Sequence, residues 1–498
     1  MSEIKRAAYK IVTVDICNKM KKNILFYPRG YDNSIQKIRI NELTGLMPPL
    51  GLASIAAVIR QKGHEIQLID ACAHLKVTNS QWAEKLAAAK PDFVGFSATT
   101  PSFNDAYDVC KKLKEIAPEI KTVFGGIHVS ALKERILQNY SAIDFIVVGE
   151  GEFAFCDIID SKKTEEIPGV FSRIDKSIVG GKPQSAKTLC NMDDLPFPAY
   201  DLIDGFPKKY NMALFSYPQF PTANIISSRG CVYHCSFCDR SVYKTSFRWN
   251  SPEYTCDLVK YLSQNFGIKH IMFYDDLFTL NRERVSKLCK LLRTKTPKIT
   301  FNCIVRIGHI DKELIAELKS AGCWMVHCGI ESGDQETLNK HKENLSLEQI
   351  RNDVEMLHKS GLWVKGLFMM GFPSETEESF RKTIDFAVSL PLKDANLTSF
   401  TPYPGAPVYC EIEEHGEFDK SPRNWNNCDC VMPVFVPYTM KSKEKMSELY
   451  GEFIRKFYNR PFAYGVYNKM FIQCPHSYWR LLKNLPIYLK YATQMKFR

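Results

Sequence analysis

Short apolar runs alternate with amphipathic stretches over residues 22–160. The apolar runs lie at 23–27, 65–70, 92–97, 121–125 and 143–148, and stretches such as 52–62 and 104–117 repeat apolar residues at helical spacing. Strands that alternate with helices in this way predict a parallel, doubly wound sheet. We therefore expect a Rossmann-like domain over 22–160, whose ligand lies beyond the carboxyl ends of the strands.

The pattern changes after this domain and then resumes. Seven prolines between positions 168 and 221 predict a linker over residues 161–220. A second series of apolar runs follows, at 223–227, 270–274, 300–305, 325–328, 364–369 and 395–401. Six strand–helix repeats predict a partial (β/α)6 barrel of the TIM type over 221–420, with its chemistry at the carboxyl strand ends. For residues 421–498 the sequence predicts a mostly helical, basic C-terminal region. The fold class is therefore α/β.

Composition is that of a soluble globular protein, with 45% hydrophobic and 24% charged residues in 498. We find no apolar run long enough to cross a bilayer, and the polar N-terminus lacks the apolar core of a signal peptide, so a cytoplasmic location is expected. The 17 cysteines form an odd, scattered set, which favours reduced thiols over a disulfide framework.

The positive charge is concentrated at the C-terminal end. Residues 441–498 contain 12 Lys and Arg against 3 Asp and Glu, a net charge of +9 out of +11 for the whole chain. One interpretation is a solvated basic face on a plain packing helix. The other is attraction to an anionic substrate or to the inner face of a membrane, which suits a lipid substrate. Nothing in the sequence resembles a nucleic-acid-binding motif, so no nucleic acid partner is expected.

Three cysteines follow the first strand of the predicted barrel, at Cys231, Cys235 and Cys238. Thiolates spaced Cys-x3-Cys-x2-Cys can bind three irons of a 4Fe–4S cluster and leave the fourth iron open, as in a catalytic metal site. A zinc site completed by His234 or Asp239 is the first alternative. The second is three unrelated buried thiols, which requires three coincidences within eight residues.

This cysteine motif resembles that of the radical S-adenosylmethionine superfamily. The resemblance implies that S-adenosylmethionine chelates the fourth iron and that one low-potential electron cleaves it to a 5′-deoxyadenosyl radical, with the cofactors carrying the chemistry. It also implies an electron donor such as flavodoxin or ferredoxin.

Residues at the other strand ends resemble the family's S-adenosylmethionine contacts. Phe237 is similar to the aromatic residue near the adenine. Asp275 or Asp276 stands where the family has a glutamate for the ammonium group, which leaves the choice between them open. Arg306 resembles the residue that pairs with the carboxylate of S-adenosylmethionine. Glu331 and Ser332 resemble contacts after the fourth strand, and Gly371 belongs to the motif of the fifth strand.

The first domain lacks the GxGxxG dinucleotide fingerprint but carries small and polar residues at three strand ends. This set resembles the cobalamin-binding domain that precedes the radical domain in one large subgroup, so the resemblance covers roughly residues 22–410. The lower-ligand histidine of many cobalamin domains is absent after the first strand, at 27–32, and neither His64 nor His128 is expected to bind cobalt. The implied cobalamin-binding residues are Ser97, Thr99, Thr100, Gly125, Gly126, Gly149 and Glu150.

The resemblance predicts a cobalamin-dependent radical enzyme that methylates an unactivated carbon of a small-molecule or lipid substrate. The alternative is an oxidoreductase or cyclase, like the anaerobic magnesium-protoporphyrin cyclase, acting on a tetrapyrrole, lipid or secondary metabolite. A tRNA methylthiotransferase ranks low, because Cys17, Cys72 and Cys110 lack a cluster-like setting. A non-enzymatic cofactor sensor ranks low as well. The sequence assigns neither a catalytic residue nor a substrate.

Overall fold

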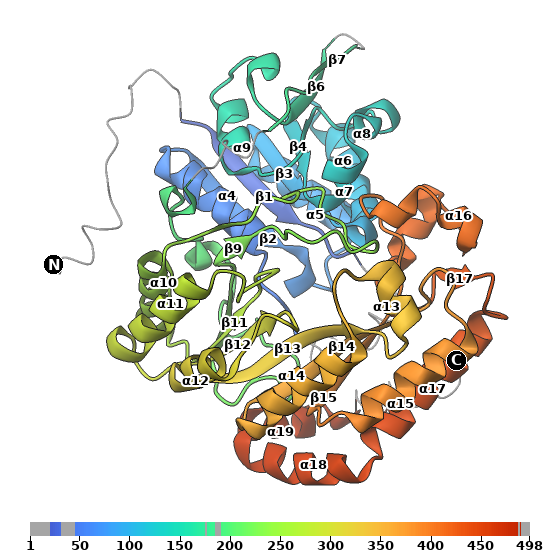
Figure 1. Ribbon diagram of the computed structural model, residues 1–498. Helices are drawn as coiled ribbons and strands as arrows, with labels where there is room; N and C mark the ends of the chain where they lie inside the picture. Colours follow the sequence, from blue (N-terminus) through green and yellow to red (C-terminus); the bar gives the residue numbers. More distant parts are fainter. Residues whose placement is uncertain (1–19, 31–44, 175–176, 185–190, 487–488, 490–498) are drawn as a thin grey trace. The chain divides into compact units, whose positions relative to one another are not determined.

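The computed structural model describes residues 20–30, 45–174, 177–184, 191–486 and 489. The chain divides into two compact units (Figure 1). Unit 1 comprises residues 1–30 and 49–204, and unit 2 comprises residues 31–48 and 205–498. Cys17 and the last residues of the basic C-terminal region lie outside the described residues.

Unit 1 is built on a seven-stranded sheet in the order β2-β1-β3-β4-β5-β6-β7. The first five strands are parallel, which confirms the Rossmann-like prediction. The last two, β6 and β7, add to the sheet in antiparallel fashion and come from the segment expected to be a linker. The strands are β1 (Lys22–Tyr27), β2 (Glu65–Asp70), β3 (Phe93–Ser97), β4 (Lys121–Gly125), β5 (Phe145–Val147), β6 (Val170–Ile174) and β7 (Ser177–Gly180).

Aromatic side chains pack the helices of unit 1 onto both faces of this sheet. Phe96 stacks on Phe124 at 4.7 Å, and Phe103 of α6 packs against Phe124 on that face. Phe93 points the other way and meets Phe155 of α9, as the alternation of side chains along a strand requires. The helices are α4 (Leu50–Gln61), α5 (Asn79–Ala89), α6 (Phe103–Ile116), α7 (Ile127–Leu132), α8 (Arg135–Asn139) and α9 (Glu152–Ile159).

Unit 2 contains six parallel strands in the order β8-β11-β12-β13-β14-β15, which confirms the partial barrel. Consecutive strands of the series are neighbours in the sheet, because a helix connects each of them to the next. The strands are β8 (Thr222–Ile225), β11 (His270–Phe273), β12 (Thr300–Val305), β13 (Cys323–Glu331), β14 (Trp363–Met370) and β15 (Asp394–Ser399).

The helices of this barrel begin at residues suited to capping. At each helix start, a Ser, Thr, Asn or Asp side chain accepts a hydrogen bond from a backbone N–H of the first turn. These capping residues define where each helix of the barrel begins. The helices are α10 (Pro252–Phe266), α11 (Arg282–Lys295), α12 (Lys312–Ser320), α13 (Gln335–His341), α14 (Leu347–Lys359) and α15 (Glu377–Ser389).

The C-terminal region is mostly helical, as expected. It contains α17 (Lys443–Tyr458), α18 (Pro461–Gln473) and α19 (Pro475–Lys483), preceded by α16 (Ile412–His415) and a small hairpin of β16 (Gly416–Phe418) and β17 (Phe435–Pro437). Phe453 of α17 packs against Phe368 of β14 at 5.5 Å, so α17 completes the hydrophobic core of the barrel. Within the described residues, no helix has the length and apolar character needed to cross a membrane.

Candidate functional site

The three cysteines of the sequence motif lie on one loop at the carboxyl end of β8. This loop is closed at its base by β9 (Ser228–Arg229), which pairs antiparallel with β10 (Arg248–Trp249). Cys231, Cys235 and Cys238 are half-buried thiols without a disulfide. Gly230 has a φ of +88°, and a Cβ there would lie 1.9 Å from the Ser246 carbonyl oxygen. Only glycine fits at this position, so the loop depends on it.

The three thiols lie on one loop and could each bind a different metal of a cluster. Among the described residues, no group of three or more His, Cys, Asp or Glu side chains is placed to hold a single metal ion. In a cubane cluster each thiolate binds a different iron. Burial raises the pKa of Cys238 to about 12, so its thiol is protonated until a metal displaces the proton.

Asp275 follows β11 and anchors the strand that leads into the cysteine loop. Its carboxylate is fully buried and accepts three hydrogen bonds, from the Ser227 backbone N–H and from the hydroxyls of Ser227 and Ser228, at 2.6–2.8 Å. The buried guanidinium of Arg284 lies 3.7 Å away. Asp275 is therefore occupied within the protein.

Asp276, the next residue, is placed differently. Its side chain is exposed and accepts a 3.2 Å hydrogen bond from the backbone N–H of Gly230, directly before the first cysteine. The surrounding protein nevertheless raises its pKa, mainly by desolvation. Asp276 is therefore the one of the two carboxylates that can meet a ligand beside the cysteine loop.

His341, at the end of α13, braces the cysteine loop from another side. The His341 carbonyl accepts from the Ser236 backbone N–H, and its Nδ1 lies 2.8 Å from Ser236 Oγ. Its Nε2 lies 3.0 Å from the Pro373 carbonyl oxygen. Because a carbonyl only accepts, Nε2 carries the hydrogen and Nδ1 accepts from the serine hydroxyl. One neutral imidazole thus ties the loop to the segment after β14.

Aromatic and aliphatic side chains fill the space behind the loop. Phe237 contacts Phe372 at 5.6 Å between ring centroids, within a cluster that includes Phe400 and Ile412. The Val408 N–H donates to the Ser236 carbonyl oxygen, so the segment after β15 also supports the loop. The cysteine loop is therefore held by segments that follow β11, β14 and β15.

Arg306 lies at the end of β12 with its guanidinium 3.4 Å from the centroid of the Tyr233 ring. It donates to the Glu343 carbonyl oxygen, and the Tyr233 hydroxyl lies 2.5 Å from His309 Nε2. Tyr233 stands between the first two cysteines, so this stack fixes the first half of the loop. Arg306 is half-buried and has further N–H groups available for an anion.

Glu331 ends β13 in an unusual backbone conformation. Its φ is +67°, and the pairing of β13 with β14 shifts register between Gly329 and Glu331. Its carboxylate forms a 2.8 Å ion pair with Lys342, whose Nζ also donates to the Gly329 carbonyl oxygen. Such a conformation in a residue with a side chain is costly and typical of functional sites.

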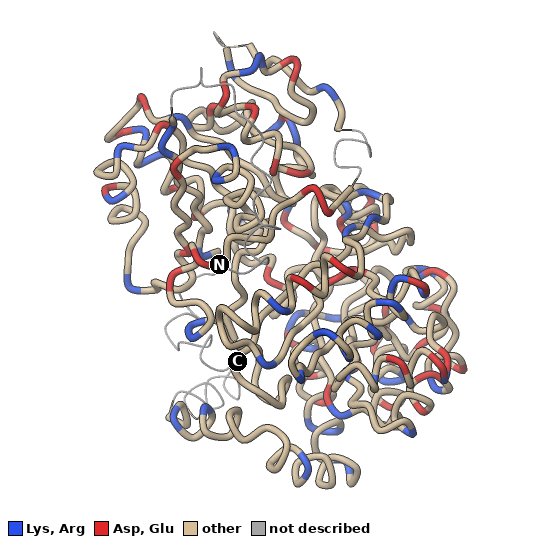
Figure 2. Tube along the Cα trace, turned by 90° about the vertical axis from the view of Figure 1, so that its left-hand side faces the viewer, with Lys and Arg blue, Asp and Glu red and all other residues tan. Residues whose placement is uncertain are grey.

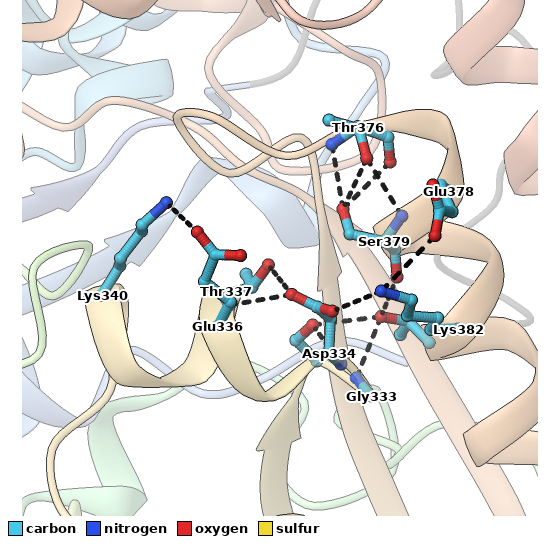
Figure 3. A network of polar contacts seen from close by, with 11 residues as sticks. Gly333, Asp334, Glu336, Thr337, Lys340, Thr376, Glu378, Ser379 and Lys382 are labelled. Atoms are coloured by element: carbon cyan, nitrogen blue, oxygen red, sulfur yellow. Dashed lines mark hydrogen bonds and ion pairs between the residues drawn. The ribbon is translucent and has the colours of Figure 1, made fainter.

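Ser332 is fully buried, and its hydroxyl is used within the protein. It lies 3.1 Å from Thr383 Oγ1 and accepts a hydrogen bond from the Asp334 N–H. Figure 3 shows the network to which this turn belongs: Asp334 caps α13 through Thr337 and pairs with Lys382 of α15. As placed, Ser332 holds the β13–α13 turn and does not present its hydroxyl to a ligand.

Gly371 follows β14 with a φ of +90°, and its N–H donates to Glu375 at 2.5 Å. Glu375 is completely buried, and within the described residues its Oε1 has no hydrogen-bond partner. Desolvation raises the pKa of this carboxyl to about 8. Glu375 is therefore protonated in the folded protein at neutral pH.

This protonation predicts a pH-dependent stability. Between about pH 4.5 and 8 the folded protein keeps a proton on Glu375 that the unfolded chain loses, so stability falls as pH rises, by about 1.4 kcal/mol per pH unit. Glu375→Gln should remove this loss, so that the variant gains a few kcal/mol over the wild type between pH 5 and pH 8. The midpoint of thermal unfolding at both pH values measures the difference. Glu378→Gln, at an exposed position of α15, is the matched control and should follow the wild type. Parallel pH profiles for wild type and Glu375→Gln would contradict the assignment.

In unit 1, the predicted cobalamin-binding residues gather at the carboxyl edge of the sheet. The order β2-β1-β3-β4-β5 reverses between β1 and β3, and ligands of such sheets bind at this point. Ser97 pairs in register with Gly125 on the adjacent strand. Gly126 has a φ of +97°, and a Cβ there would lie 2.7 Å from the Ala98 carbonyl oxygen. The two glycines and Ser97 thus form one compact edge.

The other predicted residues of unit 1 differ in accessibility. Thr99 and Glu150 are half-buried, and the Glu150 backbone is bonded on both sides to the Gln184 amide. Gly149 has a φ of +98°, and its N–H donates to Ser130 Oγ. Thr100 is buried, with its hydroxyl 3.1 Å from His128 Nδ1.

Both histidines of unit 1 singled out in the sequence are buried. His128 is fully buried, and desolvation lowers its pKa to about 3. His64 is buried and lies 3.0 Å from Asp160. Tyr31 and Asp32, where a lower-ligand motif would begin, lie outside the described residues.

Several residues that build the site were not identified from the sequence. Arg284 and His341 lie on helices between the motifs, and Lys342 directly follows α13; no spacing in the sequence separates these residues from surface residues. Each supports a motif residue across the sheet, so only the tertiary structure reveals them. The signal in the sequence is that His341 and Lys342 stand at the end of a helix that begins just after the fourth-strand motif.

Comparison with known proteins agrees with this geometry. Residues 36–159 match the B12 binding domain, and residues 225–387 match the Radical SAM superfamily. An uncharacterized methyltransferase of Pyrococcus horikoshii is 32% identical over 423 residues, which cover 83% of this chain and 88% of the relative. The anaerobic magnesium-protoporphyrin IX monomethyl ester cyclase of Rubrivivax gelatinosus is 26% identical over 86% of this chain and 77% of its own.

A solved structure shares the fold of the whole chain. The radical S-adenosylmethionine methyltransferase TsrM from Kitasatospora setae, solved with cobalamin and a [4Fe–4S] cluster bound, superimposes with a TM-score of 0.67. The alignment covers 88% of this chain and 89% of TsrM at 16% identity. At that identity the likeness concerns the fold.

Proposed function

The chain belongs to the radical S-adenosylmethionine superfamily, in the subgroup with an N-terminal cobalamin-binding domain, and from this premise we propose that it is a cobalamin-dependent methyltransferase acting on an unactivated carbon. The observation that carries the proposal is the loop of Cys231, Cys235 and Cys238, braced on several sides at the carboxyl edge of the barrel. When bound, the cluster and S-adenosylmethionine supply a 5′-deoxyadenosyl radical, and cobalamin supplies the methyl group.

The residues of the loop suit a cluster with one open iron. We assign Cys231, Cys235 and Cys238 as the cluster ligands. Gly230 allows the backbone to pass close to the cluster, since a side chain would clash with the Ser246 carbonyl. His341 and Asp276 hold the loop's backbone N–H groups, which fixes where the thiolates point.

The S-adenosylmethionine contacts are assigned by accessibility. Asp276 is assigned to the ammonium group, because Asp275 is saturated by its own hydrogen bonds. Arg306 is assigned to the carboxylate and Phe237 to the adenine side of the site. Glu331 and Gly371 contribute from the ends of β13 and β14. Ser332 acts as a positioning residue for the turn in which it is buried.

The edge formed by β3, β4 and β5 suits the large ligand of a cobalamin domain. Gly125 and Gly126 add no side chains to this edge, Gly149 makes room for the Gln184 side chain, and Ser97 and Thr99 carry hydroxyls beside it. We also assign Glu150 to this edge, with Thr100 as a buried positioning residue whose hydroxyl lies 3.1 Å from His128 Nδ1.

A radical enzyme of this family acts on a small molecule and requires a reductant. We propose a flavodoxin or ferredoxin as the electron donor. Contact with a membrane surface through the basic C-terminal region is the remaining part of the proposal.

An anaerobic assay with a strong reductant tests the reaction class. Methylation is expected to form S-adenosylhomocysteine together with 5′-deoxyadenosine, since one S-adenosylmethionine gives the methyl group and another gives the radical. Absence of both products in reconstituted protein would overturn the proposal. The cyclase relative supports the second candidate, a radical oxidoreductase or cyclase, which would form 5′-deoxyadenosine without S-adenosylhomocysteine.

Cobalamin binding is tested separately by pigment retention. Wild-type protein loaded with hydroxocobalamin should keep it through desalting. Gly126→Val should retain at least about tenfold less hydroxocobalamin than the wild type. The added side chain would clash with the Ala98 backbone, and valine is strained in the left-handed conformation of this residue. Gly63→Val, at a left-handed glycine with open space around its Cβ, controls for backbone strain and should retain the pigment. Equal retention by the two variants would contradict the assigned edge.

A further inference from the structure

The last two helices present large hydrophobic side chains to the outside. Of the 19 large hydrophobic residues exposed in the described part of the chain, nine lie between positions 462 and 489. Ile472 is 79% exposed, Trp479 70% and Phe471 65%. Leu482 lies three residues after Trp479 on the same side of α19, and Leu485 and Leu489, which follow the end of α19, are 39% and 55% exposed. We call these six residues the C-terminal hydrophobic face.

The opposite side of α19 fixes this orientation. Ser477 and Arg480 are buried, although they are polar. Ser477 Oγ accepts from the Phe215 N–H, and Arg480 donates to the Met212 carbonyl at 2.7 Å and to the Tyr217 hydroxyl at 2.9 Å. Turning the helix to bury Trp479 would break these bonds and leave a buried guanidinium unpaired, which is costly. The apolar side therefore faces outward as a fixed feature of unit 2.

The sequence of the segment that carries this face has charges of one sign. From position 453 to the C-terminus the sequence contains nine Lys and Arg and no Asp or Glu. Lys469 and Lys483, on α18 and α19, are exposed beside the hydrophobic residues. In Figure 2 the stretch that approaches the C-terminus accordingly carries blue segments and no red ones.

We propose that the C-terminal hydrophobic face binds the surface of an anionic lipid bilayer. Helices with large aliphatic and aromatic residues on one side and lysines beside them lie in the plane of the headgroups, with the apolar side in the acyl boundary. Tryptophan is favoured at this depth, and anionic lipids attract the basic residues. A symmetric contact between two copies would place this basic surface against itself, and lysine is depleted at protein interfaces.

Vesicle co-sedimentation of the full chain tests this proposal without reference to catalysis. Binding is expected to vesicles that contain phosphatidylglycerol, with weaker binding to pure phosphatidylcholine and at high salt. Ile472→Glu combined with Leu482→Glu should lower binding more than about tenfold, because both residues would insert. Ile116→Glu, at an exposed isoleucine of α6 in unit 1, is the matched control and should bind like the wild type.

Each result has a defined meaning. Thermal unfolding and 5′-deoxyadenosine formation should be unchanged in the double variant, since both residues are exposed and far in sequence from the cysteine loop. The proposal would be overturned if the wild-type protein did not bind anionic vesicles, or if the double variant bound them as well as the wild type. Light scattering that shows a dimer dissociated by the double substitution would also overturn it, because the face would then be covered by a second copy.

Discussion

Alanine in place of Cys231, Cys235 or Cys238, one at a time, is expected to reduce the brown absorbance of the anaerobically reconstituted protein and its 5′-deoxyadenosine formation to background. Under the assignment, each thiolate would be the only protein ligand of one iron in a cluster without a fourth protein ligand, so we expect no neighbouring cysteine to replace it. Iron and sulfide content, together with the product assay, provide the measurement.

The control is Cys410→Ala, which removes an exposed thiol from the same unit. This variant should retain iron, sulfide and activity. Iron and sulfide retained in all three motif variants would refute the ligand assignment. Stoichiometric zinc in place of iron in anaerobically prepared wild-type protein would favour the zinc alternative.

Replacement of the adjacent residues Asp275 and Asp276 is expected to have different effects on stability and on ligand binding. Asp275→Ala should lower the free energy of unfolding by about 3–5 kcal/mol, because it removes the carboxylate that faces the buried guanidinium of Arg284 and leaves two serine hydroxyls without that acceptor. Asp276→Ala removes one hydrogen bond to Gly230 and should cost only about 1 kcal/mol. Denaturant unfolding at neutral pH distinguishes the two.

Among variants that remain folded, we expect Asp276→Ala to weaken S-adenosylmethionine binding more than Asp275→Ala, which is the opposite of their order in stability. Asp276→Ala should weaken S-adenosylmethionine binding about 10- to 100-fold, the loss of one charged hydrogen bond. Equilibrium dialysis of the reconstituted protein measures it. Asp385→Ala, at an exposed aspartate of α15, should change neither quantity. If Asp276→Ala folds and binds S-adenosylmethionine as tightly as the wild type, the assignment of Asp276 is contradicted. Which of the two aspartates meets the ammonium group is then open, as it is from the sequence alone.

The sequence alone determined the architecture of both units and the location of the chemistry. Apolar runs of strand length separated by capped amphipathic helices are local features, so the two βα series could be read without tertiary information. The spacing of Cys231, Cys235 and Cys238 is local as well, since all three share one loop. The sequence missed β6 and β7, because their pairing with β5 depends on an available sheet edge and their own segment is rich in proline and glycine.

Only the tertiary structure decided what each motif residue does. Asp275 and Asp276 are neighbours of identical chemistry, and burial against Arg284 separates the anchor from the accessible carboxylate. Ser332 lies within a recognisable motif, yet its hydroxyl is consumed by Thr383 of a distant helix. Hydrogen bonds between segments far apart in the chain leave no periodic trace in the sequence. The same reason explains the outward face of α19, because Ser477 and Arg480 set its rotation through partners more than 250 residues away.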